Sequence, residues 1–229
     1  MSSILENPVW NALNSGTKKH SQGNARVRYM QRDKGLFVGF KFYHDAEWSD
    51  LEKWFSPGSP IILFTPGETT IPKSWAVKMQ RPIAQMIYES TEIPAPTEKQ
   101  RAVPLTDKDI PAMLALTSLT NPGPFFSKTI ELGYFEGIFD GNSLVAMTGQ
   151  RLQPDPFVEV SAVCTHPDHL GNGFAAELVR NQIRRILGES KTPFLHVYPD
   201  NFGAIRLYEK LGFRLRKEMR VYFLEKTGE

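Results

Sequence analysis

The chain has 229 residues, of which 41% are hydrophobic and 23% charged, a composition typical of globular proteins and not of disordered ones. Residues up to Glu98 include 11 basic and 10 acidic side chains, and the rest of the chain includes 16 and 15, so each half has a net charge of +1. Neither half therefore has the basic field that favours a nucleic-acid partner. The single cysteine, Cys164, excludes an intramolecular disulfide and zinc sites built from cysteine pairs. No leader pattern and no apolar stretch near the ~18 residues that span a bilayer is present, so we expect a cytoplasmic protein without membrane contact.

Residues 1–95 are predicted to form a smaller α+β domain. A helix is expected from Asn7, because asparagine caps helices and Pro8 is tolerated in the first turn. A second short helix is expected with Ser49 or Asp50 as its cap. Pro82 is expected to break a run of strand residues in two, because proline has no N–H to donate. The predicted strands, rich in Val, Ile, Phe and Tyr, cover residues 27–29, 36–43, 61–64, 75–79 and 83–88.

A linker is predicted at residues 90–100, which contain two prolines and little apolar content, and a second domain at 99–229. Its predicted elements begin with a strand at 101–105 and a helix capped at Thr106 or Asp107. Strands at 134–139 and 144–152 flank Asp140-Gly141-Asn142, a strong hairpin signal, and a fourth strand follows at 157–165.

A glycine loop connects this fourth strand to a helix that ends near Leu187. Gly171 and Gly173 permit backbone torsions and close approaches that a side chain would block, and the free N–H groups of a helix start bind phosphate. A triphosphate-binding loop needs Lys-Ser/Thr after the second glycine, where Phe174 and Ala175 stand. A dinucleotide fold needs an acidic residue at the end of the next strand, but that strand ends in Pro-Asp and leads into another helix, which disfavours NAD.

Two motifs together resemble the GNAT acetyltransferase superfamily. They are a Pro-x-x-x-Gly-x-Gly-x-Ala loop starting at Pro167 and an Asn-x-x-Ala-x-x-x-Tyr-x-x-x-Gly-Phe helix starting at Asn201. The resemblance covers roughly residues 99–226 and implies an α/β fold with a mixed, splayed sheet flanked by helices, which opens between its fourth and fifth strands to admit acetyl-CoA. The phrase from Glu159 to Pro167 and the N-terminal block are also similar to glycine N-acyltransferase-like proteins. On that reading residues 1–95 are either a degenerate GNAT-like half that walls the substrate cleft or a dimerisation module that makes a homodimer.

The resemblance also assigns the residues that hold acetyl-CoA. The backbone N–H groups of the glycine loop would bind the pyrophosphate, the fourth strand would pair with the pantetheine arm, and Asn201 would lie beside that arm. Leu170 stands where the family has Arg or Gln, which removes one charged contact but no backbone donor. The expected binding residues are Val163, Cys164, Thr165, Gly171, Asn172, Gly173, Phe174, Ala175, Ala176 and Asn201.

Catalytic roles follow from the resemblance as well. Tyr208 lies two helical turns after Asn201 and would protonate the leaving thiolate, unless it is a core aromatic residue. His196 occupies the position at which ribosomal-protein acetyltransferases carry a glutamate and is either the general base or a buried, hydrogen-bonded histidine. Glu159 is the second candidate base, or an exposed charge at a strand start. Cys164 is the rival nucleophile, although a lone cysteine among apolar neighbours favours packing.

The predicted reaction is transfer of an acetyl group from acetyl-CoA to a primary amine of a small molecule, such as an amino acid, in a ternary complex. A protein N-terminus or lysine is the alternative acceptor, and an acyl-CoA-binding regulatory module without turnover is the alternative class. No metal is expected, because His166 and His169 lack cysteine or acidic partners at ligand spacing. The basic cluster of Arg214, Arg216, Lys217 and Arg220 is either a solvated strand face or an attraction for acidic groups.

Overall fold

The computed structural model describes residues 3–96 and 101–228, and its main feature is a mixed sheet of eight strands. The strand order is β4-β11-β5-β10-β9-β8-β7-β6, in which β9 and β10 are parallel and the other neighbours are antiparallel. A small sheet, β1-β2-β3, lies outside it. This architecture confirms the predicted fold class. The strands are β1 (Ser21–Gly23), β2 (Val27–Met30), β3 (Val38–Phe40), β4 (Pro60–Thr65), β5 (Trp75–Tyr88), β6 (Val103–Pro104), β7 (Glu136–Asp140), β8 (Ser143–Gln150), β9 (Phe157–Thr165), β10 (Thr192–Val197) and β11 (Phe213–Lys226).

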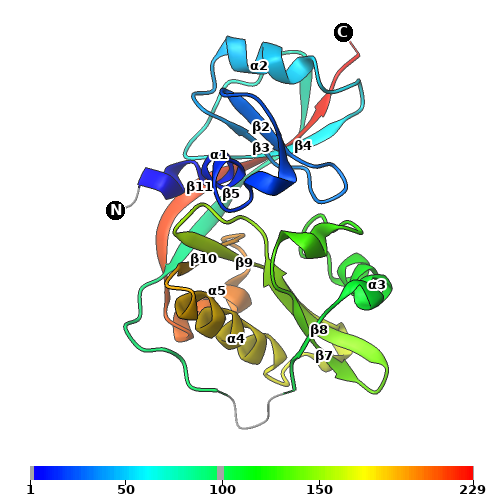
Figure 1. Cartoon of the computed structure of the whole chain (residues 1–229), viewed down its shortest axis with the longest axis vertical. Coiled ribbons are helices and arrows are strands. Elements are labelled where there is room, and N and C mark those ends of the chain that lie inside the picture. Colours follow the sequence, from blue (N-terminus) through cyan, green and yellow to red (C-terminus); the bar gives the residue numbers. More distant parts are fainter. Residues whose placement is uncertain (1–2, 97–100, 229) are drawn as a thin grey trace.

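Strand β5 is inserted between β10 and β11, which are consecutive strands in the chain. Figure 1 shows β5 and β11 running as long curved strands between the part of the molecule that holds α2 and the part that holds α4 and α5. Strands from both sides of the predicted domain boundary at 95–99 therefore share one sheet. The boundary itself stays a prediction, and its residue 99, with the last part of the predicted linker at 97–100, lies outside the described residues.

Helices cover both faces of the sheet. Helices α1 and α3 pack on one face, where α1 shares a hydrophobic cluster with Phe64, Val221 and Phe194, and α3 shares one with Cys164. Helix α4 buries an apolar stripe of Leu178, Val179, Ile183 and Ile186, and it shares the other face with α2 and α5. The helices are α1 (Pro8–Asn14), α2 (Asp45–Glu52), α3 (Ile110–Thr120), α4 (Phe174–Gly188) and α5 (Phe202–Lys210), and short 3-10 turns cover Ser3–Glu6, Lys18–His20, Asp107–Asp109, Thr129–Leu132 and Pro167–His169.

Two predicted details are wrong. Helix α2 begins at Asp45 with His44 as its cap, not at Ser49 or Asp50, because the Glu47 carboxylate accepts hydrogen bonds from the N–H groups of Phe42 and His44 at 2.8 and 2.6 Å. Strand β5 also continues through Pro82. Its pairing with β10 starts only at residue 84, so at Pro82 the one described strand beside β5 is β11. Proline is tolerated there because the other edge of β5 has no strand partner among the described residues at this point.

Other predicted elements are confirmed. Helix α1 starts with Pro8 directly after Asn7, and the Asp140-Gly141-Asn142 turn joins β7 to β8. Thr106 and Asp109 form a reciprocal capping box before α3. Within the described ranges 3–96 and 101–228, no helix is both long and apolar enough to cross a bilayer.

Candidate active site

The parallel strands β9 and β10 separate halfway along, and the candidate site lies where they part. They pair only from Phe157 to Glu159 on β9, and beyond Glu159 the edge of β9 that faces β10 pairs with none of the described strands. A cavity of about 780 Å³ opens there. It is lined by residues 160–165 of β9, residues 196–198, Asn201, Tyr208, the segment 120–124 after α3, and side chains of β4, β5 and β11. The predicted splay between the fourth and fifth strands is therefore present.

Strand β9 has a bulge at the cavity. Met147 pairs with Cys164 and Gly149 with Ser161, so β9 has one residue more than β8 between these pairs. Ala162 lies in this interval with a φ of +53°, a left-handed conformation that costs a non-glycine residue about 1–2 kcal/mol. A bulge leaves backbone groups without ladder partners, and here they border the cavity. No feature of the sequence around Ala162 indicates this conformation.

The glycine loop forms a row of unpaired backbone donors at the start of α4. Among the described residues, none accepts a hydrogen bond from the backbone N–H groups of residues 171–176. Gly171 and Gly173 have φ values of +81° and +75°, and a Cβ added to either would meet nothing within 4 Å. The loop is thus open to solvent and combines free N–H groups with the positive end of a helix dipole. This arrangement fits a diphosphate.

Asn201 and Tyr208 both line the cavity from the start and the middle of α5. The Asn201 side chain accepts a hydrogen bond from the N–H of Ala204 at 3.1 Å, so it caps the helix as well as bordering the cavity. Tyr208 is 7% exposed, and burial raises its pKa to about 12. Its phenol therefore remains protonated at neutral pH, as a general acid requires.

Glu159 and His196 are brought together in a buried network. The Nδ1 atom of His196 lies 2.7 Å from a Glu159 oxygen, and Arg151 donates hydrogen bonds of 2.9 and 2.7 Å to the same carboxylate. The side chains of Glu159 and His196 are 0% and 1% exposed. Burial opposes the charged form of Glu159, but the charge and hydrogen bonds of Arg151 outweigh it and lower the pKa to about 2. Burial lowers the pKa of His196 despite its hydrogen bond to Glu159.

The charged Glu159 carboxylate can only accept a hydrogen bond, so Nδ1 of His196 carries the proton. The other ring nitrogen lies beside Gln85 of β5. Oε1 of Gln85 accepts a hydrogen bond of 2.9 Å from Arg216, so its Nε2 is the group that lies 3.2 Å from Nε2 of His196. That ring nitrogen must then accept, and Nδ1–H donates to Glu159. Both nitrogens of the neutral imidazole are thus engaged, and neither points a free lone pair into the cavity.

Cys164 packs on the opposite side of β9 from Val163, as strand alternation predicts. Burial raises the pKa of its thiol to about 11. The thiolate needed for nucleophilic attack is therefore disfavoured.

The basic residues of β11 do not form one surface. Arg216 is the extra residue of a bulge between Leu215 and Lys217, and its side chain is only 6% exposed because it turns inward to Gln85 and Glu6. Lys217 also contacts Glu6, and Arg220 lies 3.9 Å from Glu68.

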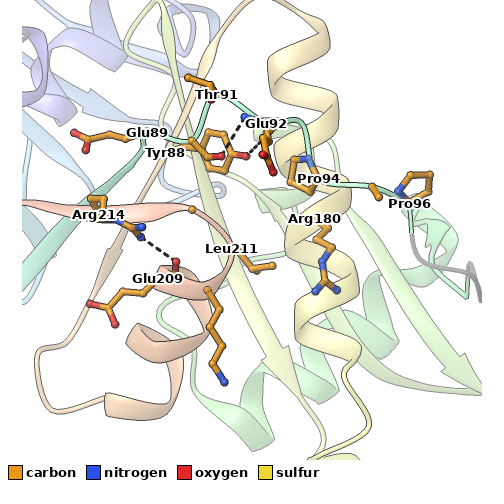
Figure 2. Close-up of a pocket in the computed structure, with 14 residues that line it drawn as sticks. Tyr88, Glu89, Thr91, Glu92, Pro94, Pro96, Arg180, Glu209, Leu211 and Arg214 are labelled. Atoms are coloured by element: carbon orange, nitrogen blue, oxygen red, sulfur yellow. Dashed lines mark hydrogen bonds between the residues drawn. The ribbon is translucent and has the colours of Figure 1, made fainter.

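Arg214 borders a second cavity, of about 840 Å³, between the segment after β5 and the end of α5. Figure 2 shows both carboxylates and cations around it. Arg214 donates a hydrogen bond to the carbonyl oxygen of Glu209, and the Tyr88 hydroxyl donates one to the backbone carbonyl of Glu92. Neither β9 nor the glycine loop contributes to its lining. The splayed cleft, where the open strand edge and Tyr208 meet, is therefore the better candidate for the active site.

Comparisons with known proteins support the same conclusion. Residues 135–222 match the family FR47-like protein. A crystal structure from Novosphingobium aromaticivorans, assigned as an acetyltransferase from the GNAT family, is 33% identical, covers 99% of this chain and 100% of its own, and superimposes with a TM-score of 0.91. The chain belongs to the GNAT family of acetyltransferases.

Two more distant relatives match this GNAT chain over different lengths. Mycothiol acetyltransferase of Corynebacterium efficiens is 31% identical over 86 residues, which are 37% of this chain and 29% of that protein, so the chain matches under a third of that relative's length. A GCN5-related N-acetyltransferase from Kribbella flavida is 15% identical, covers 98% of this chain and 96% of its own with a TM-score of 0.65, and shows the common fold alone.

Three residues of the site escaped the sequence analysis. Arg151 follows β8 and binds Glu159, Gln85 lies on β5 and bonds His196, and Ala162 forms the bulge. The run of apolar residues on both sides of Gln85 was a usable signal that Gln85 is buried, but its partners across the sheet belong to strands more than 100 residues away.

Proposed function

We propose that the protein transfers an acetyl group from acetyl-CoA to a primary amine of a small molecule, by direct attack in a ternary complex. The observation that carries the proposal is the row of unpaired N–H groups at residues 171–176, which follows the open edge of β9 in the chain. The loop fits the diphosphate, and Val163, Cys164 and Thr165 offer backbone groups to an extended pantetheine arm. The thioester would then lie by the bulge at Ala162, beside Tyr208.

In the proposed reaction the amine nitrogen forms a bond to the thioester carbon, and the carbon–sulfur bond breaks. An ammonium substrate loses two protons overall, one of which ends on the sulfur while the other leaves to solvent. The protonated phenol of Tyr208 would supply the proton to the sulfur, and one of the two protons from the ammonium would then restore the phenol.

The contacts of Glu159 and His196 support a positioning role for both. Glu159 is the last β9 residue paired with β10, and its ion pair with Arg151 and bond to His196 connect the two strands where they part. Loss of the amine's proton is favoured in another way. No Asp or Glu is among the described cavity-lining residues, so the lining has no carboxylate of its own to stabilise an ammonium ion.

The proposal is tested by thiol release from acetyl-CoA over a panel of primary amines, together with calorimetric binding of acetyl-CoA. Tyr208→Phe is expected to bind acetyl-CoA within twofold of wild type and to lose about 10²- to 10⁴-fold in turnover. Tyr198→Phe is the matched control, because it removes a hydroxyl from another tyrosine that lines the cavity and is expected to keep its turnover.

Acetyl-CoA binding without thiol release on any amine would contradict the proposal and support a non-catalytic acyl-CoA-binding module. Thiol release that occurs only with protein N-termini or lysine side chains as acceptors would indicate that the acceptor is a protein. The cytoplasmic location expected from the cysteine count stays a prediction.

A further inference from the structure

The end of the cavity away from the glycine loop is an apolar floor built by the N-terminal half and β11. Strand register places Phe64, Val221 and Arg81 in one row across β4, β11 and β5, and Ile62, Phe223 and Met79 in the next row. All six side chains line the cavity. Five of them are apolar, so this floor fits a large hydrocarbon or aromatic group.

Arg81 is the one charged side chain in these two rows. Its guanidinium lies over the Tyr198 ring, 4.4 Å from the ring centre, and this contact holds it beside the cavity that both residues line. Its Nη2 atom donates to Asp200 at 2.5 Å, and the described residues provide no acceptor for its other nitrogens. Arg81 and Asp200 are 40% and 65% exposed, and exposed ion pairs of this kind contribute little. The guanidinium is therefore held in place while most of its donors are available.

The other two cations of the lining differ from Arg81. Arg151 is bound to the buried carboxylate of Glu159, and Lys78, whose pair with Glu225 at 2.9 Å is as exposed as that of Arg81, is an ammonium without the planar set of donors of a guanidinium. No lining residue among those described carries a carboxylate, so the cavity offers no partner to a second positive charge on a substrate. Polyamines and basic peptides are disfavoured for this reason.

Building on the proposed transferase function, we infer that the acceptor is an amino acid with a large apolar side chain, and that Arg81 binds its carboxylate. The side chain packs on the floor formed by Val221, Phe223 and Met79. A planar guanidinium with free donors matches a carboxylate in a two-pronged geometry.

The test compares L-phenylalanine with 2-phenylethylamine, which has the same ring and amine but no carboxylate. Wild-type protein is expected to prefer L-phenylalanine by about tenfold or more in kcat/KM, since losing a hydrogen-bonded charged group is costly. Arg81→Met keeps the apolar stem and is expected to abolish the preference while 2-phenylethylamine is used as before. The intrinsic reactivities of the two amines cancel when the ratio is compared between proteins.

Asp200→Asn is the matched control. It breaks the same ion pair from the other side and is expected to keep or increase the preference for L-phenylalanine, because Arg81 loses its competing partner. A wild-type protein that uses 2-phenylethylamine as well as L-phenylalanine would overturn the inference. So would an Asp200→Asn variant that loses the preference as Arg81→Met does.

Calorimetric binding of both amines to the protein saturated with coenzyme A separates this inference from the proposed function. Tighter binding of L-phenylalanine that depends on Arg81 supports the inference even if no thiol is released. Thiol release with 2-phenylethylamine but no carboxylate preference supports the transferase and rejects the role of Arg81.

Discussion

Replacing Glu159 with glutamine is expected to destabilise the fold by about 3 kcal/mol, and two related arguments, which share the contact with Arg151, lead to this figure. The first is the ion pair. Arg151 is 17% exposed and Glu159 0%, and removing one partner of a buried pair costs roughly 3–5 kcal/mol because the other charge is left without compensation. The second is the pKa. A folded value of about 2 against the ordinary 4.5 corresponds to roughly 3 kcal/mol at neutral pH.

The stabilisation by Glu159 is expected to depend on pH. The unfolded carboxyl group takes up a proton near pH 4.5, whereas the folded one stays charged to about pH 2, so protons favour the unfolded chain between these values. The stabilisation by Glu159 is therefore complete above pH 4.5 and is lost as the pH falls toward 2. In Glu159→Gln this part of the loss of stability at low pH is expected to be absent.

Urea unfolding and thermal melting of wild type and Glu159→Gln at pH 7 and at several values down to pH 3 measure both effects. At pH 7 the melting temperature is expected to fall by roughly 6–12 °C. The double variant Arg151→Met with Glu159→Gln is the control, because it leaves no uncompensated arginine charge while the glutamine oxygen can still accept from His196, so it is expected to be more stable than Glu159→Gln alone. A Glu159→Gln protein within about 1 kcal/mol of wild type, with an unchanged acid profile, would refute the reasoning.

Two further predictions concern the loop and the cysteine. Gly173→Ala places a Cβ on a residue with a φ of +75°, which is expected to lower the free energy of unfolding by about 1–2 kcal/mol and to weaken acetyl-CoA binding. Gly188→Ala, at the other end of α4, is the control and is expected to bind acetyl-CoA normally. Equal calorimetric affinities of the two variants would contradict the role of the left-handed loop. Cys164→Ala is expected to keep turnover within a few-fold of wild type, because burial raises the thiol pKa to about 11 and disfavours a thiolate. An acetylated Cys164 in intact-mass spectra, with turnover lost in the folded variant, would establish the covalent route instead.

The parts of the site that local patterns encode were predictable. A glycine loop before a helix, an asparagine at a helix start and a tyrosine two turns later are all short-range features, and the structure places the last two on the cavity and the loop amides in the open. The Glu159–His196 contact depends on pairing between strands 37 residues apart, and whether either residue is free or buried depends on Arg151 and Gln85. Residue type alone therefore left His196 between a base and a structural role.

The least predictable feature is the position of β5, and it determines the acceptor end of the site. A strand from residues 75–88 between β10 and β11 requires pairings over more than 100 residues, which no alternation of apolar side chains specifies. That insertion carries Gln85 to His196 and Arg81 to Tyr198, and it brings Met79 beside Phe223 on the cavity floor. The glycine loop and β9, which would hold acetyl-CoA, come from the C-terminal half, whereas most of the surface that would meet the amine comes from the N-terminal half or from the strand paired with it. Changes in residues 60–88 would therefore alter which amine is accepted without disturbing the loop, and this explains why the sequence motifs indicate acetyl transfer but not its acceptor.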